Sequence, residues 1–379
     1  MNCPSRFCKK SEPELVPNHH TYLLPSYSMQ QQDRIQNIQA LRGVAVLFVV
    51  FLHLFSVERK YGGLETILPD ILQFGIFGVD MFFVISGFVM VTVTRGKFRN
   101  FRHAVTFIYR RLSRIYPLYW VYTLLVLVVF LIQPSWVNSK QGNHISILES
   151  FLLIPSHYLP LVMVGWTLIH EIYFYTVFSL ALLFSSEKRL PFVLVGWGGI
   201  VVLGSVLFTV TLPTLRILFH PLTLEFIGGC FLAILYQKRN FTVKPAILVV
   251  LALAALVASV SGYYLFTVVT GRIEPLYWWR VFIFGIPALA IVFCLINAER
   301  NGYLMNRYLI RVGDASYSIY LSHILSLSLV GRIWGTFSVN GLADNMVVLP
   351  LALVFVIIVG MASYSLVEKP LLRISRKLI

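Results

Sequence analysis

The sequence predicts an all-α integral membrane protein with about ten transmembrane helices and both termini in the cytoplasm. Of its 379 residues, 58% are hydrophobic and only 12% are charged. The mean hydropathy of +0.78 is far from the profile of soluble globular chains. Windows long enough to cross a bilayer as a helix recur along the chain. They lie near 41–57, 74–94, 116–133, 166–185, 191–210, 221–237, 245–268, 280–298, 315–331 and 346–366.

The basic residues predict the orientation of these helices. The net charge of +15 is compatible with a nucleic-acid partner, but the basic residues lie between apolar spans and not on a hydrophilic domain with aromatic readers. We therefore expect no nucleic acid. With the N-terminus inside, the outer face holds only seven of the 31 Lys and Arg residues, namely Arg59, Lys60, Lys140, Arg216, Arg272, Arg280 and Arg332. The positive-inside rule then places both termini in the cytoplasm.

The chain divides into one membrane domain with two short polar ends. We expect residues 1–37 to form a disordered polar tail, 38–370 the transmembrane domain and 371–379 a basic cytoplasmic tail. The translation start is either Met1 or Met29, because everything that the fold needs follows Met29. The four cysteines show neither metal-ligand nor redox-pair spacing, so we assign them no chemistry.

An arginine and a histidine share the first predicted helix. Arg42 and His53 are eleven residues apart, which on a helix is just over three turns and a rise of ~16 Å. They therefore share one face, with Arg42 at the cytoplasmic boundary and His53 near the middle of the bilayer. A neutral imidazole there can act as a general base. The alternative is a core histidine bonded to a neighbouring helix, with Arg42 as a membrane anchor, and the helix alone does not decide between them.

Residues 75–88 combine glycines with a single carboxylate in the sequence GIFGVDMFFVISGF. Gly75, Gly78 and Gly87 permit close approach of helices. Asp80 lies at the outer end of the helix, where it can contact a substrate, be hydrated or cap the helix. Ser86 lacks the Gly-x-Ser-x-Gly elbow of a hydrolase nucleophile, so we interpret it as a helix-packing residue.

The segment between the second and third predicted spans is densely basic. Arg111 and Arg114, three residues apart, share a helix face and can present two planar guanidinium groups to phosphate oxygens. We expect the following helix to start near Pro117. A phosphorylated cofactor and anionic lipid head groups explain the segment equally well. Its basic residues are Arg95, Lys97, Arg99, Arg102, Arg110, Arg111 and Arg114.

Later spans carry further polar groups within the membrane. Glu171 and Glu225 lie at a similar outer depth in two different spans, so the two carboxylates can face one outward-opening cavity. A hydrated interfacial position is the alternative for Glu225. His323 lies near mid-bilayer in the ninth span, with the hydroxyl groups of Ser316 and Tyr320 nearby. Hydrogen bonding between helices is the favoured role for these hydroxyl groups.

Seven motifs in order resemble those of the acyltransferase family 3 membrane proteins, the bacterial polysaccharide O-acyltransferases. The resemblance covers residues 36–372 and is closest to the branch that acts on secreted exopolysaccharide. Each motif is weak alone, but their order on a ten-helix topology makes the resemblance specific. The motifs are LRGVAVLFVVFLH, FGVDMFFVISGF, RRLSRIYPLYW, GWTLIHEIYFY, LEFIGGCFLA, ASYSIYLSH and VEKPL.

This resemblance implies transfer of an acyl group, usually acetyl from acetyl-CoA, to a sugar hydroxyl group. The implied acceptor is a surface or exported polysaccharide, such as exopolysaccharide or lipopolysaccharide, or its lipid-linked precursor. The implied location is the bacterial inner (cytoplasmic) membrane, with acyl-CoA, the glycan and membrane lipids as partners and no metal. A homo-oligomer and a polysaccharide-synthesis complex are both left open.

The resemblance also implies roles for individual residues. By matched position His53 is the catalytic residue, and Glu171 is the acidic residue of the fourth-span motif. We expect His53 either to deprotonate the acceptor hydroxyl group or to carry the acyl group briefly, and Glu171 to position the sugar or the imidazole. The expected donor-binding residues are Arg42, Arg111 and Arg114. From their own positions in the predicted spans, and not from the resemblance, the residues expected to contact the acceptor or support the site are Asp80, Glu225, Ser316, Tyr320 and His323. The competing interpretations are a transporter or flippase for a lipid-linked glycan and a scaffold, and the lack of inverted similarity between the two halves counts against transport.

Overall fold

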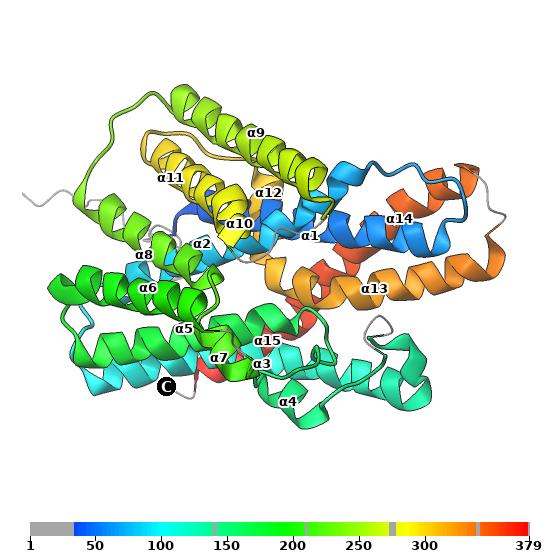
Figure 1. The fold of residues 1–379 in the computed structure, drawn as a ribbon, viewed down its shortest axis with the longest axis horizontal. Coiled ribbons are helices and arrows are strands. Elements are labelled where there is room, and N and C mark those ends of the chain that lie inside the picture. Colours follow the sequence, from blue (N-terminus) through cyan, green and yellow to red (C-terminus); the bar gives the residue numbers. More distant parts are fainter. Residues whose placement is uncertain (1–33, 139–141, 209–210, 273–277, 339–341, 378–379) are drawn as a thin grey trace, which may run out of the picture. The chain divides into compact units, whose positions relative to one another are not determined.

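Helices are the only regular secondary structure in the part of the chain that the structure describes, and loops join them (Figure 1). This computed structural model describes residues 34–138, 142–208, 211–272, 278–338 and 342–377. The chain forms two units, Met1–Arg34 and Ile35–Ile379, and the described elements belong to the second. Most of the predicted polar tail, including Met29, lies outside the described residues.

The α-helices follow one another along the chain, with short 3-10 and π-helical turns at some of their ends. The π-helical turns are Val281–Gly285, before α11, and Tyr364–Glu368, after α14. The α-helices are α1 (Gln36–Tyr61), α2 (Phe77–Thr94), α3 (Phe101–Ile132), α4 (Ile147–Leu152), α5 (Gly165–Phe184), α6 (Leu190–Leu207), α7 (Pro213–Leu218), α8 (Leu222–Lys238), α9 (Pro245–Thr270), α10 (Trp278–Arg280), α11 (Ile286–Arg300), α12 (Arg307–Asp314), α13 (Ser316–Phe337), α14 (Leu342–Ser363) and α15 (Lys369–Arg376).

Nine helical segments among the described residues are long and apolar enough to cross a membrane. The remaining predicted span, 315–331, lies in α13 except for its first residue. Helix α13 has 22 residues but is rich in serine and tyrosine. The prediction of about ten spans is therefore confirmed for nine. Whether α13 also crosses, and whether both termini are cytoplasmic, stay predictions. The nine segments are Gln36–Tyr61, Asp70–Thr94, Phe101–Ile132, Gly165–Phe184, Glu187–Leu207, Pro213–Lys238, Pro245–Thr270, Trp278–Arg300 and Leu342–Arg376.

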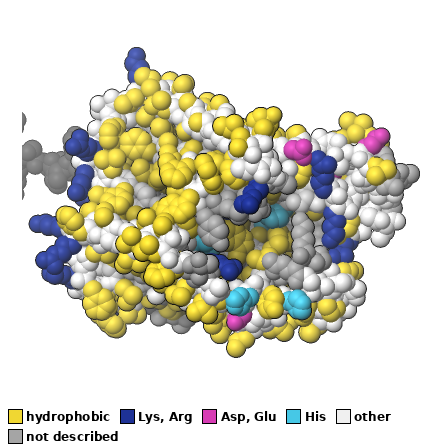
Figure 2. Space-filling view, viewed as in Figure 1, with side chains coloured by type: hydrophobic (Ala, Val, Ile, Leu, Met, Phe, Trp, Pro, Cys, Tyr) yellow, Lys and Arg dark blue, Asp and Glu magenta, His cyan; other side chains and the backbone are white. Residues whose placement is uncertain are grey.

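The spans differ in how much of their apolar surface other helices cover. In the most apolar 18-residue stretch of the segment Asp70–Thr94, 67% of the residues are buried, whereas in that of Pro245–Thr270 only 22% are buried. Figure 2 shows a largely hydrophobic face on which Lys and Arg side chains gather mainly toward the two ends. Apolar sides with charged ends are the arrangement that lipid contact requires.

Helix α3 differs from the sequence-based expectation at Pro117. The sequence predicts a helix start near this proline, but α3 begins at Phe101, where the Asn100 side chain accepts a hydrogen bond from the His103 N–H at 3.1 Å. The helix continues through Pro117, because loss of one backbone hydrogen bond is tolerated in a membrane helix whose neighbours compensate. Most of the basic segment is therefore the first half of a continuous helix.

Glycines allow the central helices to approach closely, as predicted. A Cβ atom on Gly87 of α2 would collide with the Phe226 carbonyl oxygen of α8, and one on Gly229 of α8 would collide with the Val84 carbonyl oxygen of α2. Gly75 likewise faces a backbone carbonyl group of α1. The predicted use of glycine for helix packing is confirmed at these positions.

We expect Gly229→Ala to destabilise the protein by about 1–3 kcal/mol. The added methyl group meets backbone atoms of α2, which cannot rotate away as a side chain can. The matched control is Gly196→Ala in α6, where, beyond the neighbouring turns of its own helix, no heavy atom of the described residues lies within 4 Å of the added Cβ. Thermal unfolding in detergent micelles measures the difference, and equal midpoints for the two variants would contradict the close packing of α2 and α8.

The start of α1 is tied to α11. Glu299 accepts hydrogen bonds from the backbone N–H groups of Gln36 at 2.8 Å and Asn37 at 2.6 Å. A carboxylate from another helix thus satisfies N–H groups that a helix start leaves without partners. The contact fixes where α1 begins and hence the height of the functional residues along it.

Candidate active site

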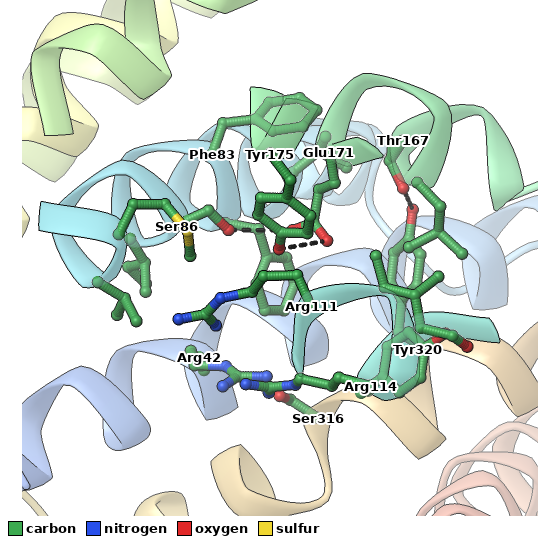
Figure 3. Close-up of a pocket in the computed structure, with 18 residues that line it drawn as sticks. Arg42, Phe83, Ser86, Arg111, Arg114, Thr167, Glu171, Tyr175, Ser316 and Tyr320 are labelled. Carbon is green, nitrogen blue, oxygen red and sulfur yellow. Dashed lines mark hydrogen bonds between the residues drawn. The ribbon is translucent and has the colours of Figure 1, made fainter. Parts of the chain in front are cut away.

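A pocket lies where α1, α2, α3, α5 and α13 meet (Figure 3). It encloses about 770 Å³ of empty space, part of it open to solvent. Helices far apart in the sequence thereby bring most of the predicted site residues together. The predicted residues that line it are Arg42, Arg111, Arg114, Glu171, Ser316 and Tyr320.

Three arginines line one side of this pocket. Arg111 and Arg114 come from one face of α3, as predicted, and Arg42 comes from α1. The Arg111 guanidinium lies over the Tyr175 ring at 5.9 Å, and its Nε atom is buried with no hydrogen-bond partner in the described part of the chain. None of the three forms an ion pair with a carboxylate of the described residues. Such a concentration of guanidinium groups favours an anionic ligand.

The structure sorts the basic residues of α3 and the turn before it into two sets. Arg111 and Arg114 are half-buried and line the pocket, whereas Arg110 is exposed. The exposed set suits lipid head groups at the membrane surface, and the pocket-lining pair suits a bound phosphate. The two explanations that the sequence leaves open therefore fit different residues. The exposed set is Arg95, Lys97, Arg99, Arg102 and Arg110.

Glu171 lies opposite the arginines (Figure 3). Its Oε1 atom accepts a hydrogen bond from Ser86 Oγ at 3.0 Å, and its Oε2 atom accepts one from the Tyr175 hydroxyl group at 3.0 Å. These bonds offset part of the cost of placing a carboxylate within the membrane. Ser86, interpreted from the sequence as a packing residue, therefore also belongs to the pocket.

Two of the three predicted supporting residues of α13, Ser316 and Tyr320, lie in the pocket wall. The Tyr320 hydroxyl group is 2.8 Å from Thr167 Oγ1 of α5, a bond between helices of the expected kind. Ser316 Oγ is buried and has no hydrogen-bond partner among the described residues. Because buried hydroxyl groups normally have partners, Ser316 is a candidate contact for a ligand.

Glu368 also belongs to this region, and sequence reasoning missed it. Its Oε2 atom accepts a hydrogen bond from Ser318 Oγ at 2.6 Å, and it is close enough to Arg42 and Arg114 to interact with both electrostatically. The residue is part of the motif VEKPL. Nothing in the sequence indicates that the π-helical turn holding it packs against α3 and α13.

His53 is not among the residues that line the pocket, and it faces His323 of α13. The two ring centroids are 4.9 Å apart, and His323 Nε2 is 3.3 Å from His53 Nδ1. His53 Nδ1 is also 2.8 Å from the Val49 carbonyl oxygen. His323 is fully buried, whereas His53 is half-buried. The structure thus joins two predicted site residues in a histidine pair.

Tyr320 connects the pocket with the histidine pair. Its side chain lines the pocket, and its carbonyl oxygen is 2.6 Å from His323 Nδ1. Arg42 and His53 lie on the single helix α1, as predicted, and the helical rise separates them by ~16 Å. One continuous helix therefore carries an arginine of the pocket and one imidazole of the pair.

Asp80 and Glu225 form a third group, near the N-terminal ends of α2 and α8. Asp80 is fully buried, and Arg280 donates to it from Nε at 2.8 Å and from Nη2 at 2.9 Å. Glu225 lies close enough to Asp80 to interact with it electrostatically. Glu225 is not among the described residues that line the pocket of Glu171, so the expectation of one shared cavity is not met there. Residue spacing predicts the depth of each carboxylate but not its direction.

The described residues do not converge on a metal-binding arrangement. No group of three or more His, Cys, Asp or Glu side chains is placed to hold a metal ion in the described part of the chain. The converging groups are instead the three arginines of the pocket, an ion pair and a histidine pair. The ligand that the pocket fits best is an anion such as a phosphate.

Comparisons with known proteins identify relatives of the chain. A family model described as an acyltransferase domain matches residues 35–365. The exopolysaccharide production protein ExoZ of Rhizobium meliloti (strain 1021) is 31% identical over 335 residues, which cover 85% of this chain and 95% of that protein. The acyltransferase MdmB of Streptomyces mycarofaciens is 25% identical over 389 residues, covering 90% of this chain and 92% of the relative. No solved structure matches the chain significantly.

The family match spans every helix that contributes to the pocket and to the histidine pair. Together with the nine apolar helical segments found among the described residues, it identifies a multi-pass membrane protein. These comparisons lend no support to a transporter or flippase. The chain belongs to the acyltransferase 3 family.

Proposed function

We propose that the protein transfers an acyl group, in the first place acetyl, from acyl-CoA to a sugar hydroxyl group of an exported or surface polysaccharide or its lipid-linked precursor. The observation that carries this proposal is the set of three arginines that line one pocket without an ion pair to a described carboxylate. The phosphate groups of coenzyme A are matching anions. The acceptor class rests on the relative named for exopolysaccharide production.

The pocket sets the orientation of the donor. The phosphate groups of acyl-CoA bind the three arginines, and the Glu171 carboxylate on the opposite wall repels these phosphate groups. The negatively charged end of the donor therefore has one favourable position. Ser86 and Tyr175 hold the Glu171 carboxylate in place. The thioester arm then extends along α1 toward His53.

His53 supplies the base for the transfer. It takes the proton of the acceptor hydroxyl group while the oxygen attacks the thioester carbonyl carbon. The carbon–sulfur bond then breaks, and the imidazolium returns the proton to the leaving thiolate. Such general-base help is typically worth ~10²–10⁴ in rate.

We place the protein in the cytoplasmic membrane of a bacterium, with the Arg42 end of α1 at the cytoplasmic face. The distribution of basic residues supports this orientation. The exposed arginines of α3 contact anionic lipids there. The exposed apolar faces contact lipid, a second copy of the chain or a polysaccharide-synthesis complex.

The proposal is tested by measuring ester-linked acyl groups on the surface polysaccharide by NMR. The samples are the parent strain, a deletion strain, and the deletion strain carrying wild-type protein or Arg42→Gln at matched membrane levels. We expect acylation to be lost on deletion and restored only by the wild type, with normal polymer yield. Unchanged acylation with loss of surface polymer would instead identify a glycan transporter, and no change in either would point to a scaffold.

A further inference from the structure

We infer that His323 is a positioning residue for His53, because it accepts a hydrogen bond from His53 Nδ1–H and so holds the imidazole with Nε2 as its basic nitrogen. This inference rests on the proposed function and deepens it. Without His323, the His53 imidazole is still a base, but it loses the hydrogen-bond acceptor that fixes the orientation of its ring.

The hydrogen bonds to backbone carbonyl groups assign the protons of the pair. A carbonyl oxygen only accepts, so the Tyr320 carbonyl oxygen, 2.6 Å from His323 Nδ1, places a proton on that nitrogen. A neutral His323 then has its lone pair on Nε2. The Val49 carbonyl oxygen, 2.8 Å from His53 Nδ1, places a proton there by the same argument.

The proton between the two rings therefore belongs to His53. His53 Nδ1–H is shared between the Val49 carbonyl oxygen and His323 Nε2, which lie 2.8 and 3.3 Å from the nitrogen. In this tautomer the basic lone pair of His53 is on Nε2, on the opposite side of the ring. Two acceptors on different helices thus fix both the tautomer and the plane of the ring.

The burial of the two rings agrees with this division of roles. His323 has no exposed surface, whereas His53 is half-buried, so only His53 is accessible to a substrate. A base that is oriented by a third group behind it is a common arrangement in acyl transfer. When His53 takes a proton during the reaction, its bond to His323 becomes charge-assisted and stronger.

Two isosteric substitutions separate this role from a purely structural one. His323→Gln places an amide oxygen near the position of Nε2, where it can still accept from His53. His323→Asn places its amide near Nδ1, where it can still donate to the Tyr320 carbonyl group but does not reach His53. A positioning role therefore requires glutamine to work better than asparagine, and a structural role requires the reverse.

The measurement uses isolated membranes of the deletion strain that carry each variant at matched levels. Radiolabelled acetyl-CoA is titrated, and transfer of label into the glycan fraction of the same membranes gives the maximal rate and the KM for the donor. We expect His323→Asn to lower the maximal rate on the order of 10–100-fold, the loss that removing the hydrogen-bond partner of a metal-ligating histidine typically causes. We expect an unchanged KM, and a rate for His323→Gln several-fold or more above that of His323→Asn.

Other outcomes would overturn the inference. If His323→Asn is active and His323→Gln is inactive, His323 serves the structure through its bond to the Tyr320 carbonyl group. If both variants are fully active, His323 has no role in the reaction. Two inactive but folded variants would make His323 part of the proton chemistry itself. An active His53→Ala, or a wild type without transfer, would contradict the proposed function and not this inference alone.

A second measurement requires no variant of His323. Solid-state NMR of the ¹⁵N-histidine-labelled protein in lipid reports the tautomer of each ring, and His53 is identified by the signals that His53→Ala removes. We expect Nδ1–H for His53. An Nε2–H tautomer of His53 would overturn the inference.

Discussion

His53→Ala is expected to lower the rate of acyl transfer by ~10²–10⁴, the usual contribution of a general base. The variant loses the only group that we assign to the removal of the acceptor proton, while the arginine pocket stays intact. The KM for acyl-CoA should therefore change little. Transfer of label from acetyl-CoA in isolated membranes measures both quantities.

Ser56→Ala, a substitution on the same helix, is the control for the loss of activity in His53→Ala. Ser56 lies one turn beyond His53, is exposed, and donates its hydroxyl hydrogen bond to the Leu52 carbonyl oxygen of its own helix. Ser56→Ala should therefore retain the wild-type rate. A His53→Ala protein with the thermal stability and the activity of the wild type would remove His53 from the mechanism.

Arg114→Gln is expected to raise the KM for acyl-CoA by about 10–100-fold, because a hydrogen bond to a charged group contributes roughly 1.5–3 kcal/mol. The maximal rate at saturating donor should fall less, since His53 and its partner are untouched. Titration of acyl-CoA in isolated membranes separates the two effects.

The neighbouring Arg110 offers a matched control. It has the same charge, lies on the same helix and is exposed outside the pocket. Arg110→Gln should leave the KM for acyl-CoA unchanged. An equal rise for both variants would mean that α3 attracts the donor through its total charge and not through a defined pocket.

The sequence predicts the helices well, because apolar length alone determines which segments can lie in a membrane. It also predicts the shared face of Arg111 and Arg114, since three residues on a helix are less than one turn. It fails at Pro117, where a local rule about helix starts is outweighed by the capping of α3 at Asn100 and by its packing.

The sequence does not predict which side chains on different helices bond to one another. Asp80 pairs with Arg280, 200 residues away, and Glu171 pairs with Ser86, 85 residues away. Such pairs depend on how each helix is rotated about its axis, which hydropathy does not record. The same reason explains why Glu368 was missed and why Glu225 does not share the pocket of Glu171.

The single helix that carries Arg42 and His53 has a consequence for the choice of donor. Its start is fixed by Glu299, and the helical rise sets the separation of the two residues at ~16 Å. Under the proposed function, α1 sets the distance that the donor must span between its bound phosphate groups and its thioester. Selectivity among donors would then follow the length of the arm more closely than the size of the group that is transferred.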